Sequence, residues 1–316
     1  MNKKKIVIVG GGNGSAISIN AVKNFGDKVK ISAVVSTSDS NGSSGLLRKE
    51  FKTLPPGDVM RAILAMSPYN YDILKKIFYK NRFSGCKKLD KHDLGNLFLV
   101  WAEKYAKDYL SAVRALEQAV DAIGHVYPNS LQPSDLVAEF LDGKIVKTEG
   151  KIDRPEKKST SRIKKTWLEP KVKAYPDAIK AIKEADVIIM GPGSLYCSIV
   201  ATLLPVGIKE AINKSKAKLI YVCGNAYEMI GEKGPVKLSE FVRELQTYLP
   251  RKIDLVIFDS AELDIKQKQH YKEKKWALIE NDTHNISEYK VIAGNFERTT
   301  GGLCPEKLGK IFKKII

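Results

Sequence analysis

The chain has 316 residues, of which 43% are hydrophobic and 28% are charged, the ordinary composition of a globular protein with a large core. No apolar run approaches the roughly 20 residues that a membrane helix needs, and no signal peptide is evident, so we expect a cytoplasmic protein without a membrane partner. The formal net charge of +17 would suit nucleic acid, but the lysines are spread along the chain and we do not expect nucleic-acid binding.

The first predicted strand, residues 5–9, leads into a glycine-rich turn at residues 10–15. Its Ile-Val-Ile-Val run has no polar face, as expected of a strand buried on both sides of a parallel sheet. The glycines let a ligand approach the N–H groups that open the following helix, at about residues 15–25. Ser15 stands where the dinucleotide fingerprint has its third glycine. A nicotinamide site and a purely structural turn therefore stay open beside a different nucleotide-type ligand.

A helical block is predicted after the second strand, residues 30–35, and the serine- and glycine-rich loop at residues 36–45. Asp58 follows two prolines, and it either caps a helix that begins near Val59 or contacts a ligand. Apolar residues at helical spacing, Trp101 and Tyr105 among them, predict helices at 71–83 and 92–123. We therefore expect a helical insertion at about residues 59–124 that forms one wall of a cleft.

Strands and helices alternate again in the second half of the chain. A β-hairpin is predicted at about residues 135–152, and the basic run at 154–165 is a solvated loop, an edge strand or a phosphate-binding patch. The further elements are buried strands at 185–190, 218–223 and 254–258, and helices at 177–184, 195–215, 238–248 and 304–316. This order predicts a single α/β domain over residues 1–316, with a Rossmann-like, doubly wound, mainly parallel sheet and an inserted helical lobe.

Three loops, at residues 10–15, 36–45 and 191–198, should meet at the carboxyl edge of this sheet, where ligands of such folds bind. Their N–H groups and hydroxyls, with Arg48, could hold a diphosphate without a metal. Asp39 is the only carboxylate in these loops, so they offer no carboxylate pair for magnesium, and we predict no metal ligands.

Histidines and cysteines give weaker signals. His92 and Asn96 lie at a predicted helix start, as local caps or as ligand contacts. No histidine lies in a nucleophile-elbow motif, which argues against a serine hydrolase. The four cysteines are far apart and lack Cys-x-x-Cys spacing, so we expect free thiols in a reducing compartment.

Five loop motifs follow one another along the chain. They are Gly-Gly-Gly-Asn-Gly at 10–14, Asp-Ser-Asn-Gly-Ser-Ser-Gly at 39–45, Pro-Pro-Gly-Asp at 55–58, His-x-x-Gly-Asn-Leu-Phe-Leu at 92–99 and Gly-Pro-Gly-Ser-Leu-Tyr at 191–196. Each motif alone is weak, but the ordered set resembles the gluconeogenesis-factor (YvcK-like) proteins of the 2-phospho-L-lactate transferase (CofD-like) superfamily.

The resemblance implies a Rossmann-like fold with its site at the carboxyl ends of the strands. In the gluconeogenesis-factor branch the site holds a UDP-sugar such as UDP-N-acetylglucosamine, and the protein regulates carbon metabolism, cell-envelope growth and cell shape. In the transferase branch it holds a guanosine phosphate, and a magnesium-assisted reaction passes phospholactate to a deazaflavin precursor. The Gly-Pro-Gly-Ser-Leu-Tyr form is closer to the first branch, so we expect a binding protein. If the chain is instead a transferase, Mg²⁺ is the expected cofactor and Asp39 the expected catalytic residue.

At one of four departures from the family pattern, Cys223-Gly224-Asn225 stands where Cys-Asn is usual. Ser40 replaces the second aspartate of a pair, the Gln-Pro-Gly-Glu-Thr element is not recognisable in residues 228–234, and Arg-His-Asp is reduced to Arg298-Thr299-Thr300. Tyr271 and Arg298 match the branch's sugar-nucleotide contacts, or are a half-buried tyrosine and a surface arginine. The expected ligand-binding residues are Gly11, Gly12, Asn13, Gly14, Asp39, Asn41, Ser43, Ser44, Arg48, Asp58, His92, Asn96, Gly191, Gly193, Ser194, Leu195, Tyr196, Ser198, Asn225, Tyr271 and Arg298. As partners we expect a nucleotide or UDP-sugar ligand and a second copy of the chain in a homodimer.

Overall fold

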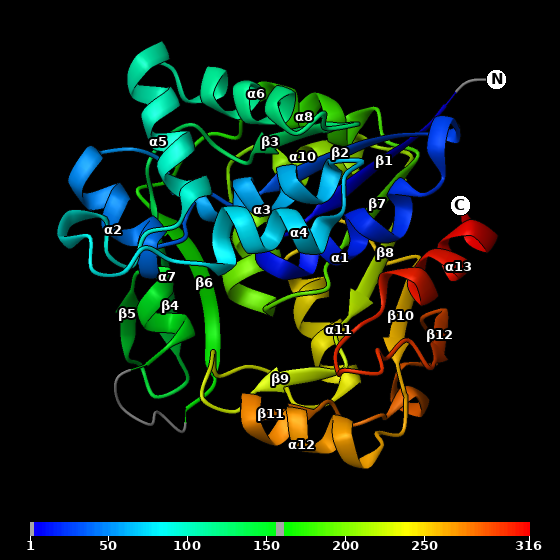
Figure 1. Ribbon diagram of the computed structural model, residues 1–316. Helices are drawn as coiled ribbons and strands as arrows, with labels where there is room; N and C mark the ends of the chain where they lie inside the picture. The colour runs from blue at the N-terminus through cyan, green and yellow to red at the C-terminus, as the bar shows by residue number, and fades with distance from the viewer. Residues whose placement is uncertain (1–2, 156–160) are drawn as a thin grey trace.

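The computed structural model of the protein describes residues 3–155 and 161–316, and its centre is a seven-stranded sheet between two layers of helices (Figure 1). The strand order is β12-β10-β8-β7-β1-β2-β3, and all neighbouring strands run parallel. The strands are β1 (Lys4–Val9), β2 (Val29–Val35), β3 (His125–Pro128), β7 (Val187–Met190), β8 (Lys218–Cys223), β10 (Leu255–Asp259) and β12 (Val291–Gly294). The predicted Rossmann-like, mainly parallel sheet is therefore confirmed.

The sheet is buried on both faces because its strands are apolar on both faces. In β1, Ile6 and Ile8 belong to one hydrophobic core, whereas Val7 and Val9 belong to the other. The first core is completed by α1 (Gly12–Lys23), α3 (Gly57–Met66), α6 (Tyr109–Ala119) and α13 (Pro305–Ile315). The second is completed by α8 (Pro176–Lys183), α10 (Ile208–Lys214) and α11 (Leu238–Thr247).

The segment between β2 and β3 is helical, but the helix predicted at 92–123 is two helices. These are α5 (Leu94–Ala106) and α6, and the chain turns between them at Lys107, whose φ of 56° is left-handed. Asp108 then caps α6 by accepting a hydrogen bond of 2.7 Å from the Ser111 N–H. Trp101 and Tyr105 lie in a helix as predicted but are 65% and 88% exposed, and α5 packs through Leu99 and Val100. The remaining elements here are α2 (Gly42–Phe51), α4 (Tyr71–Lys75), η2 (Lys76–Lys80) and η3 (Lys87–Leu89).

Several predicted boundaries move because helices start inside the glycine-rich loops. α1 begins at Gly12 rather than at residue 15, and α2 begins at Gly42, inside the loop predicted at 36–45. The helix predicted at 195–215 is divided by Pro205 and by Gly207, whose φ is +108°. Its pieces are η4 (Leu195–Val200), α9 (Ala201–Leu203) and α10.

Two small antiparallel sheets flank the central one. The predicted hairpin is confirmed as β4 (Asp135–Phe140) and β5 (Ile145–Lys147), and β6 (Ile163–Glu169) pairs with β4. Part of the basic run is therefore an edge strand, whereas Lys157 and Lys158 lie outside the described residues. The second sheet pairs β9 (Ala226–Glu228) with β11 (Trp276–Leu278), beside α12 in Figure 1. The other elements are α7 (Glu149–Asp153), α12 (Ile265–Lys274), η1 (Gly26–Lys28) and η5 (Thr283–Ile286).

Cys86, Cys197, Cys223 and Cys304 are all free thiols, as predicted. Within residues 3–155 and 161–316, no helix is both long and apolar enough to cross a bilayer.

Candidate functional site

The strand order changes direction between β1 and β7, and a chamber of about 450 Å³ opens beside the ends of these strands. All three loops singled out in the sequence contribute to its wall, through Gly11 to Gly14, through Asp39 and Asn41, and through Gly193, Ser194, Leu195 and Ser198. The chamber has the volume of an ordinary small-molecule site. The three loops therefore converge as predicted.

Two glycine turns form the floor of the chamber by packing directly against each other. A Cβ on Gly14 would lie 1.8 Å from the Pro192 carbonyl oxygen, so only glycine permits this approach. The Ser198 hydroxyl accepts a hydrogen bond of 2.7 Å from the Gly11 N–H and donates one of 3.1 Å to the Gly11 carbonyl. Ser18 donates a hydrogen bond of 2.6 Å to the Gly191 carbonyl. These contacts fix the turn after β1 relative to the turn after β7.

The helix that follows each glycine turn receives a carboxylate of the chain at its N-terminus. Glu232 accepts hydrogen bonds from the N–H groups of Leu195, Tyr196 and Cys197 at 2.6–3.2 Å. At α1, the Gly12 N–H donates to Asp58, and a Cβ on Gly11 would lie 2.2 Å from Asp58 Oδ2. The expectation that the N–H groups of the 191–198 loop are open to a diphosphate is thus corrected, because Glu232 occupies them.

Asp58 lies one residue inside α3, where Pro56 is the N-cap residue, so Asp58 does not cap this helix and instead faces Gly12. Burial raises the pKa of Asp58 to about 6. The Arg61 guanidinium, whose Nη1 lies 2.8 Å from Asp58 Oδ1, opposes this rise. Arg61 also lies over the ring of Tyr79, which donates a hydrogen bond of 3.1 Å to Asn13 Oδ1. Sequence reasoning missed Arg61, although its spacing of three from Asp58 on a helix predicts such a pair.

More carboxylates reach the chamber than the three loops contain. α7 contributes Glu149 and Asp153, and burial raises their pKa values to about 9 and about 6. Glu149 accepts a hydrogen bond from the Ser40 N–H at 3.2 Å. The side chains of Glu149, Asp153 and Cys197 each bring one ligand-type atom to within 4.8 Å of the others. No sequence pattern indicates this cluster, because α7 follows a hairpin and is remote from the glycine motifs.

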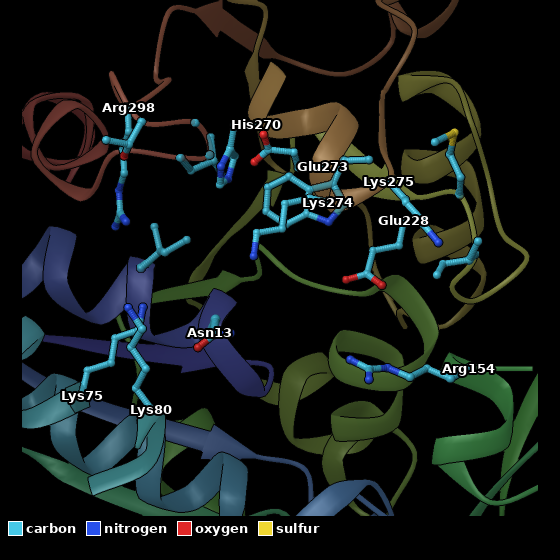
Figure 2. Close-up of a pocket in the computed structure, with 18 of the residues that line it drawn as sticks. Asn13, Lys75, Lys80, Arg154, Glu228, His270, Glu273, Lys274, Lys275 and Arg298 are labelled. Carbon is cyan, nitrogen blue, oxygen red and sulfur yellow. The ribbon is translucent and has the colours of Figure 1, made fainter. Parts of the chain in front are cut away.

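A larger cleft of about 1480 Å³ adjoins the chamber, and basic side chains dominate its walls. Figure 2 shows Lys75 and Lys80 on one side, Arg298 above them and Arg154 across the cleft. Lys233, Lys274 and Lys275 add to this charge, against the two carboxylates Glu228 and Glu273. Asn13, Arg154, Glu228 and Trp276 line both the cleft and the chamber. The two cavities are therefore neighbouring parts of one site, the cleft basic and the chamber acidic.

Several predicted site residues make structural contacts away from the walls of both cavities. Arg48 contacts Asp135 at 2.8 Å and donates to the Ser134 carbonyl at 2.8 Å, which ties α2 to β4. Arg48 was expected in a diphosphate site, and these contacts correct that expectation. His92 Nδ1 lies 2.9 Å from Ser43 Oγ, and Asn96 Nδ2 donates to Asp93 at 3.0 Å.

Other predicted residues lie behind the walls of the site and pack against them. Asn225 and Tyr271 hydrogen-bond to each other and to Glu297 behind the turn that carries Arg298. Tyr196 is 1% exposed, and the Ser44 hydroxyl packs against Gly57 beside Asp39. These residues support the two cavities and do not line them within the part of the chain that the structure describes.

Residues 6–297 match the family described as 2-phospho-L-lactate transferase CofD. The chain belongs to this family. Among curated relatives, this CofD-family chain is 38% identical over 286 residues to a putative gluconeogenesis factor of Thermotoga maritima, with 89% of this chain and 87% of that protein covered. It is 33% identical to the gluconeogenesis factor of Bacillus subtilis, with 90% and 87% covered.

A solved structure agrees with this membership over the whole chain. The crystal structure of a UPF0052 family protein from Bacillus halodurans superimposes with a TM-score of 0.89 at 30% sequence identity, and 99% of each chain is covered. The resemblance seen in the five loop motifs is thereby confirmed. The family match ends at Glu297, immediately before Arg298.

Proposed function

We propose that this CofD-family chain is a binding protein for a sugar nucleotide of the UDP-sugar class, and that it regulates carbon metabolism and cell-envelope growth. Its relatives named gluconeogenesis factor support the regulatory role. The free cysteines support a place in the reducing cytoplasm. We also propose that the chain forms a homodimer.

The observation that carries the proposal is the division of one site into a basic and an acidic part. A sugar nucleotide is divided in the same way, because its diphosphate is anionic and its sugar is a neutral polyol. Arginine and lysine bind phosphate oxygens, which suits Arg154, Arg298 and the lysines of the cleft. Carboxylates accept hydrogen bonds from sugar hydroxyls, which suits Asp39 and Asp58 in the chamber. Asn13, which lines both parts, would lie between the diphosphate and the sugar.

The proposal differs from the sequence hypothesis in where it puts the diphosphate. Glu232 fills the N-terminus of η4, and a second anion there would be repelled by its carboxylate. The diphosphate is therefore assigned to the cleft side of Asn13, and the 191–198 loop is assigned to the sugar.

Isothermal titration with UDP-N-acetylglucosamine, UDP-glucose, GTP and NAD, each with and without magnesium, tests the proposal. We expect micromolar binding of a UDP-sugar without magnesium. Arg298→Ala should weaken this binding about tenfold or more, since a charge-assisted hydrogen bond is lost. Arg243→Ala is the matched control, because Arg243 is exposed on α11 and, among the described residues, donates to the Asn285 carbonyl alone. Equal affinities for both variants would contradict the assignment of the cleft.

The second candidate is a nucleotide-dependent transferase of the phospholactate type, and the carboxylates of the chamber favour it. Asp39 and Asp58 both line the chamber, and the charge of Asp39 helps to raise the pKa of Asp58. Their carboxylate oxygens are ligands that Mg²⁺ prefers. Asp39 and Asp58 would hold this ion, which would neutralise charge on a transferring group. The cluster of Glu149, Asp153 and Cys197 is a poorer fit for Mg²⁺ because a thiol is a soft ligand.

Magnesium-dependent release of a guanosine monophosphate in the presence of a deazaflavin acceptor would support the transferase. Asp39→Asn should then abolish turnover while leaving the protein folded. Binding of a UDP-sugar without magnesium, together with no turnover on any deazaflavin acceptor, would leave the regulator as the function.

A further inference from the structure

Two carboxyl groups are buried in contact with each other beneath the turn that carries Arg298. Asp259 ends β10 and is 3% exposed, and Glu297 lies between β12 and α13 and is 2% exposed. Their side chains are in hydrogen-bond contact. Because two carboxylates in contact cannot both carry a charge in a buried site, this contact requires a proton between them.

The other hydrogen bonds of Asp259 locate this proton. Asp259 Oδ1 accepts from the N–H groups of Ala261 and Phe296, both at 3.0 Å. Asp259 Oδ2 is buried and has no N–H or hydroxyl donor among the described residues. A buried carboxyl oxygen without a donor is costly, and a proton on one of the two carboxyl groups removes that cost. The shared proton therefore lies between Asp259 Oδ2 and Glu297.

Glu297 uses its carboxyl oxygens to join three elements around the site. Tyr271 of α12 donates to it at 3.0 Å, and Asn225, which follows β8, donates through Nδ2. The Gly302 N–H also donates to Glu297 Oε1. Glu297 is thus the common partner of Asn225 and Tyr271, two residues that the sequence assigned to the ligand.

The turn held by Glu297 is the one that directs Arg298 into the basic cleft. The Arg298 N–H donates to the Gly302 carbonyl at 2.7 Å, and Gln267 Nε2 donates to the Arg298 carbonyl at 2.6 Å. Gly301 and Gly302 have φ values of +93° and +82°, so the turn is tight. Figure 2 shows the Arg298 side chain reaching down toward Lys75 and Lys80. A movement of Glu297 would therefore move Arg298.

We propose that Glu297 is a positioning residue for Arg298, and that it holds Arg298 toward an anionic ligand only while Glu297 and Asp259 share a proton. The proposal rests on the proposed function in one respect, the identity of that anion as the diphosphate of a sugar nucleotide. When the proton is lost, two negative charges are left in contact, and the turn at 297–302 is the part that can move away from β10.

The groups around the pair lower the pKa values of the two carboxyl groups by less than burial raises them. Tyr271 faces the pair as a neutral phenol, because burial and the neighbouring Glu297 raise its pKa. Lys307 of α13 donates to the Glu297 carbonyl at 2.8 Å and to Asn295, and its charge opposes the rise in the pKa of Asp259 without cancelling it. His270 packs on Gly301, on the far side of the turn. Burial raises the pKa of Glu297 to about 7, and burial also raises the pKa of Asp259, which puts the loss of the proton near neutral pH.

Conservative amide variants can hold either half of the pair in its protonated form. In Glu297→Gln the amide nitrogen donates to Asp259 and the amide oxygen still accepts from Tyr271 and Gly302, so the hydrogen bond that is lost is the one from Asn225. In Asp259→Asn the amide donates to Glu297 instead. Both variants should keep Arg298 in place at every pH. Glu262→Gln, at an exposed carboxylate two residues beyond Ser260, is the matched control.

Hydrogen exchange of the full chain tests the shared proton without any ligand. Peptides covering residues 297–303 are compared between wild type and variants at one pH, so intrinsic exchange rates cancel. At pH 6 all proteins should exchange alike, and at pH 8.5 wild type and Glu262→Gln should exchange about tenfold faster than Glu297→Gln and Asp259→Asn. Equal exchange of wild type and both amide variants at pH 8.5 overturns the proposal.

Titration with UDP-N-acetylglucosamine tests the effect on Arg298. Wild type should lose about tenfold in affinity between pH 6.5 and pH 8.5, whereas the two amide variants should keep one affinity and Arg298→Ala should be weak at both pH values. An equal loss in wild type and in the amide variants overturns the positioning role. If wild type binds no UDP-sugar at either pH, the proposed function fails, and the same series with inorganic pyrophosphate decides the positioning role separately.

Discussion

The carboxylate of Glu232 accepts a hydrogen bond of 2.6 Å from the Leu195 N–H, at the first turn of η4. The N–H groups of Tyr196 and Cys197 complete the set of donors around it. A phosphate at a helix N-terminus is bound by donors of this kind. One carboxylate of the chain thus stands where the glycine-rich motif predicts the phosphate of a ligand.

Replacing Glu232 should therefore destabilise the protein. Glu232→Ala leaves three N–H groups without their acceptor, and we expect the free energy of unfolding to fall by about 1–3 kcal/mol. Glu232→Gln keeps one acceptor oxygen and should lose less. Urea unfolding measures both, with Glu262→Ala at an exposed site as the control. A Glu232→Ala protein as stable as the control would show that the cap contributes nothing.

Gly14 should tolerate no side chain, because the two glycine turns touch at this point. An alanine Cβ would lie 1.8 Å from the Pro192 carbonyl oxygen, and both turns would have to separate. We expect Gly14→Ala to cost about 1–3 kcal/mol of unfolding free energy, as overpacking does. Gly224→Ala is the control, because a Cβ there meets nothing closer than 3.5 Å. Similar unfolding midpoints for the two variants would contradict the close packing of the turns.

Much of the fold could be predicted from local pattern. Buried strands such as residues 5–9 have apolar residues on both faces, and parallel strands place their following loops at one sheet edge, so the convergence of the three loops was predictable. The split between α5 and α6 was not, because Lys107 adopts a left-handed conformation that its residue type does not indicate. Tertiary packing also left Trp101 and Tyr105 outside although their spacing is helical.

The acidic half of the site could not be predicted, because its residues lie in unrelated parts of the sequence. Glu149 is in a short helix after a hairpin, and Glu232 is in an irregular segment whose motif departs from the family. Neither residue has a chemical signature of its own. Arg48 was instead predicted to be a site residue and is not one. Its position after a serine- and glycine-rich motif suggested a phosphate contact, but it contacts Asp135 and Ser134, which lie far along the chain.

The acidic cluster should make the protein more stable at low pH than at high pH. Burial raises the pKa of Glu149 in the folded protein to about 9, well above the usual value of about 4.3 that applies when the chain is unfolded. The folded state therefore holds a proton that the unfolded state has released, and stability is full below the unfolded pKa and is lost as pH rises toward the folded pKa. Asp58 and Asp153, both with pKa values of about 6, act in the same direction between about pH 4 and pH 6.

Glu149→Gln separates the effect of Glu149 on the free energy of unfolding from the effects of Asp58 and Asp153. Glutamine matches the protonated acid and can still accept from the Ser40 N–H, so we expect it to raise the free energy of unfolding at pH 8 by about 1–3 kcal/mol and to change little at pH 4. Urea unfolding at both pH values measures the effect, and Glu288→Gln on the exposed surface is the control. A variant that is less stable than wild type at pH 8 would show that the Glu149 charge is stabilised by a partner.

Two arginines near the site should respond differently to the same substitution. Arg154 lines both cavities, its side chain is 77% exposed, and it lies 3.7 Å from Asp153. Exposed ion pairs contribute little to stability, so Arg154→Ala should keep the unfolding free energy of wild type while weakening UDP-sugar binding by about tenfold. Arg48→Ala should do the reverse, losing about 1 kcal/mol with its contacts to β4 while binding stays within about twofold of wild type. Urea unfolding measures the stability of both variants, and calorimetric titration measures their UDP-sugar binding. Loss of binding in Arg48→Ala with binding intact in Arg154→Ala would return the diphosphate to the loops after β2 and remove it from the cleft.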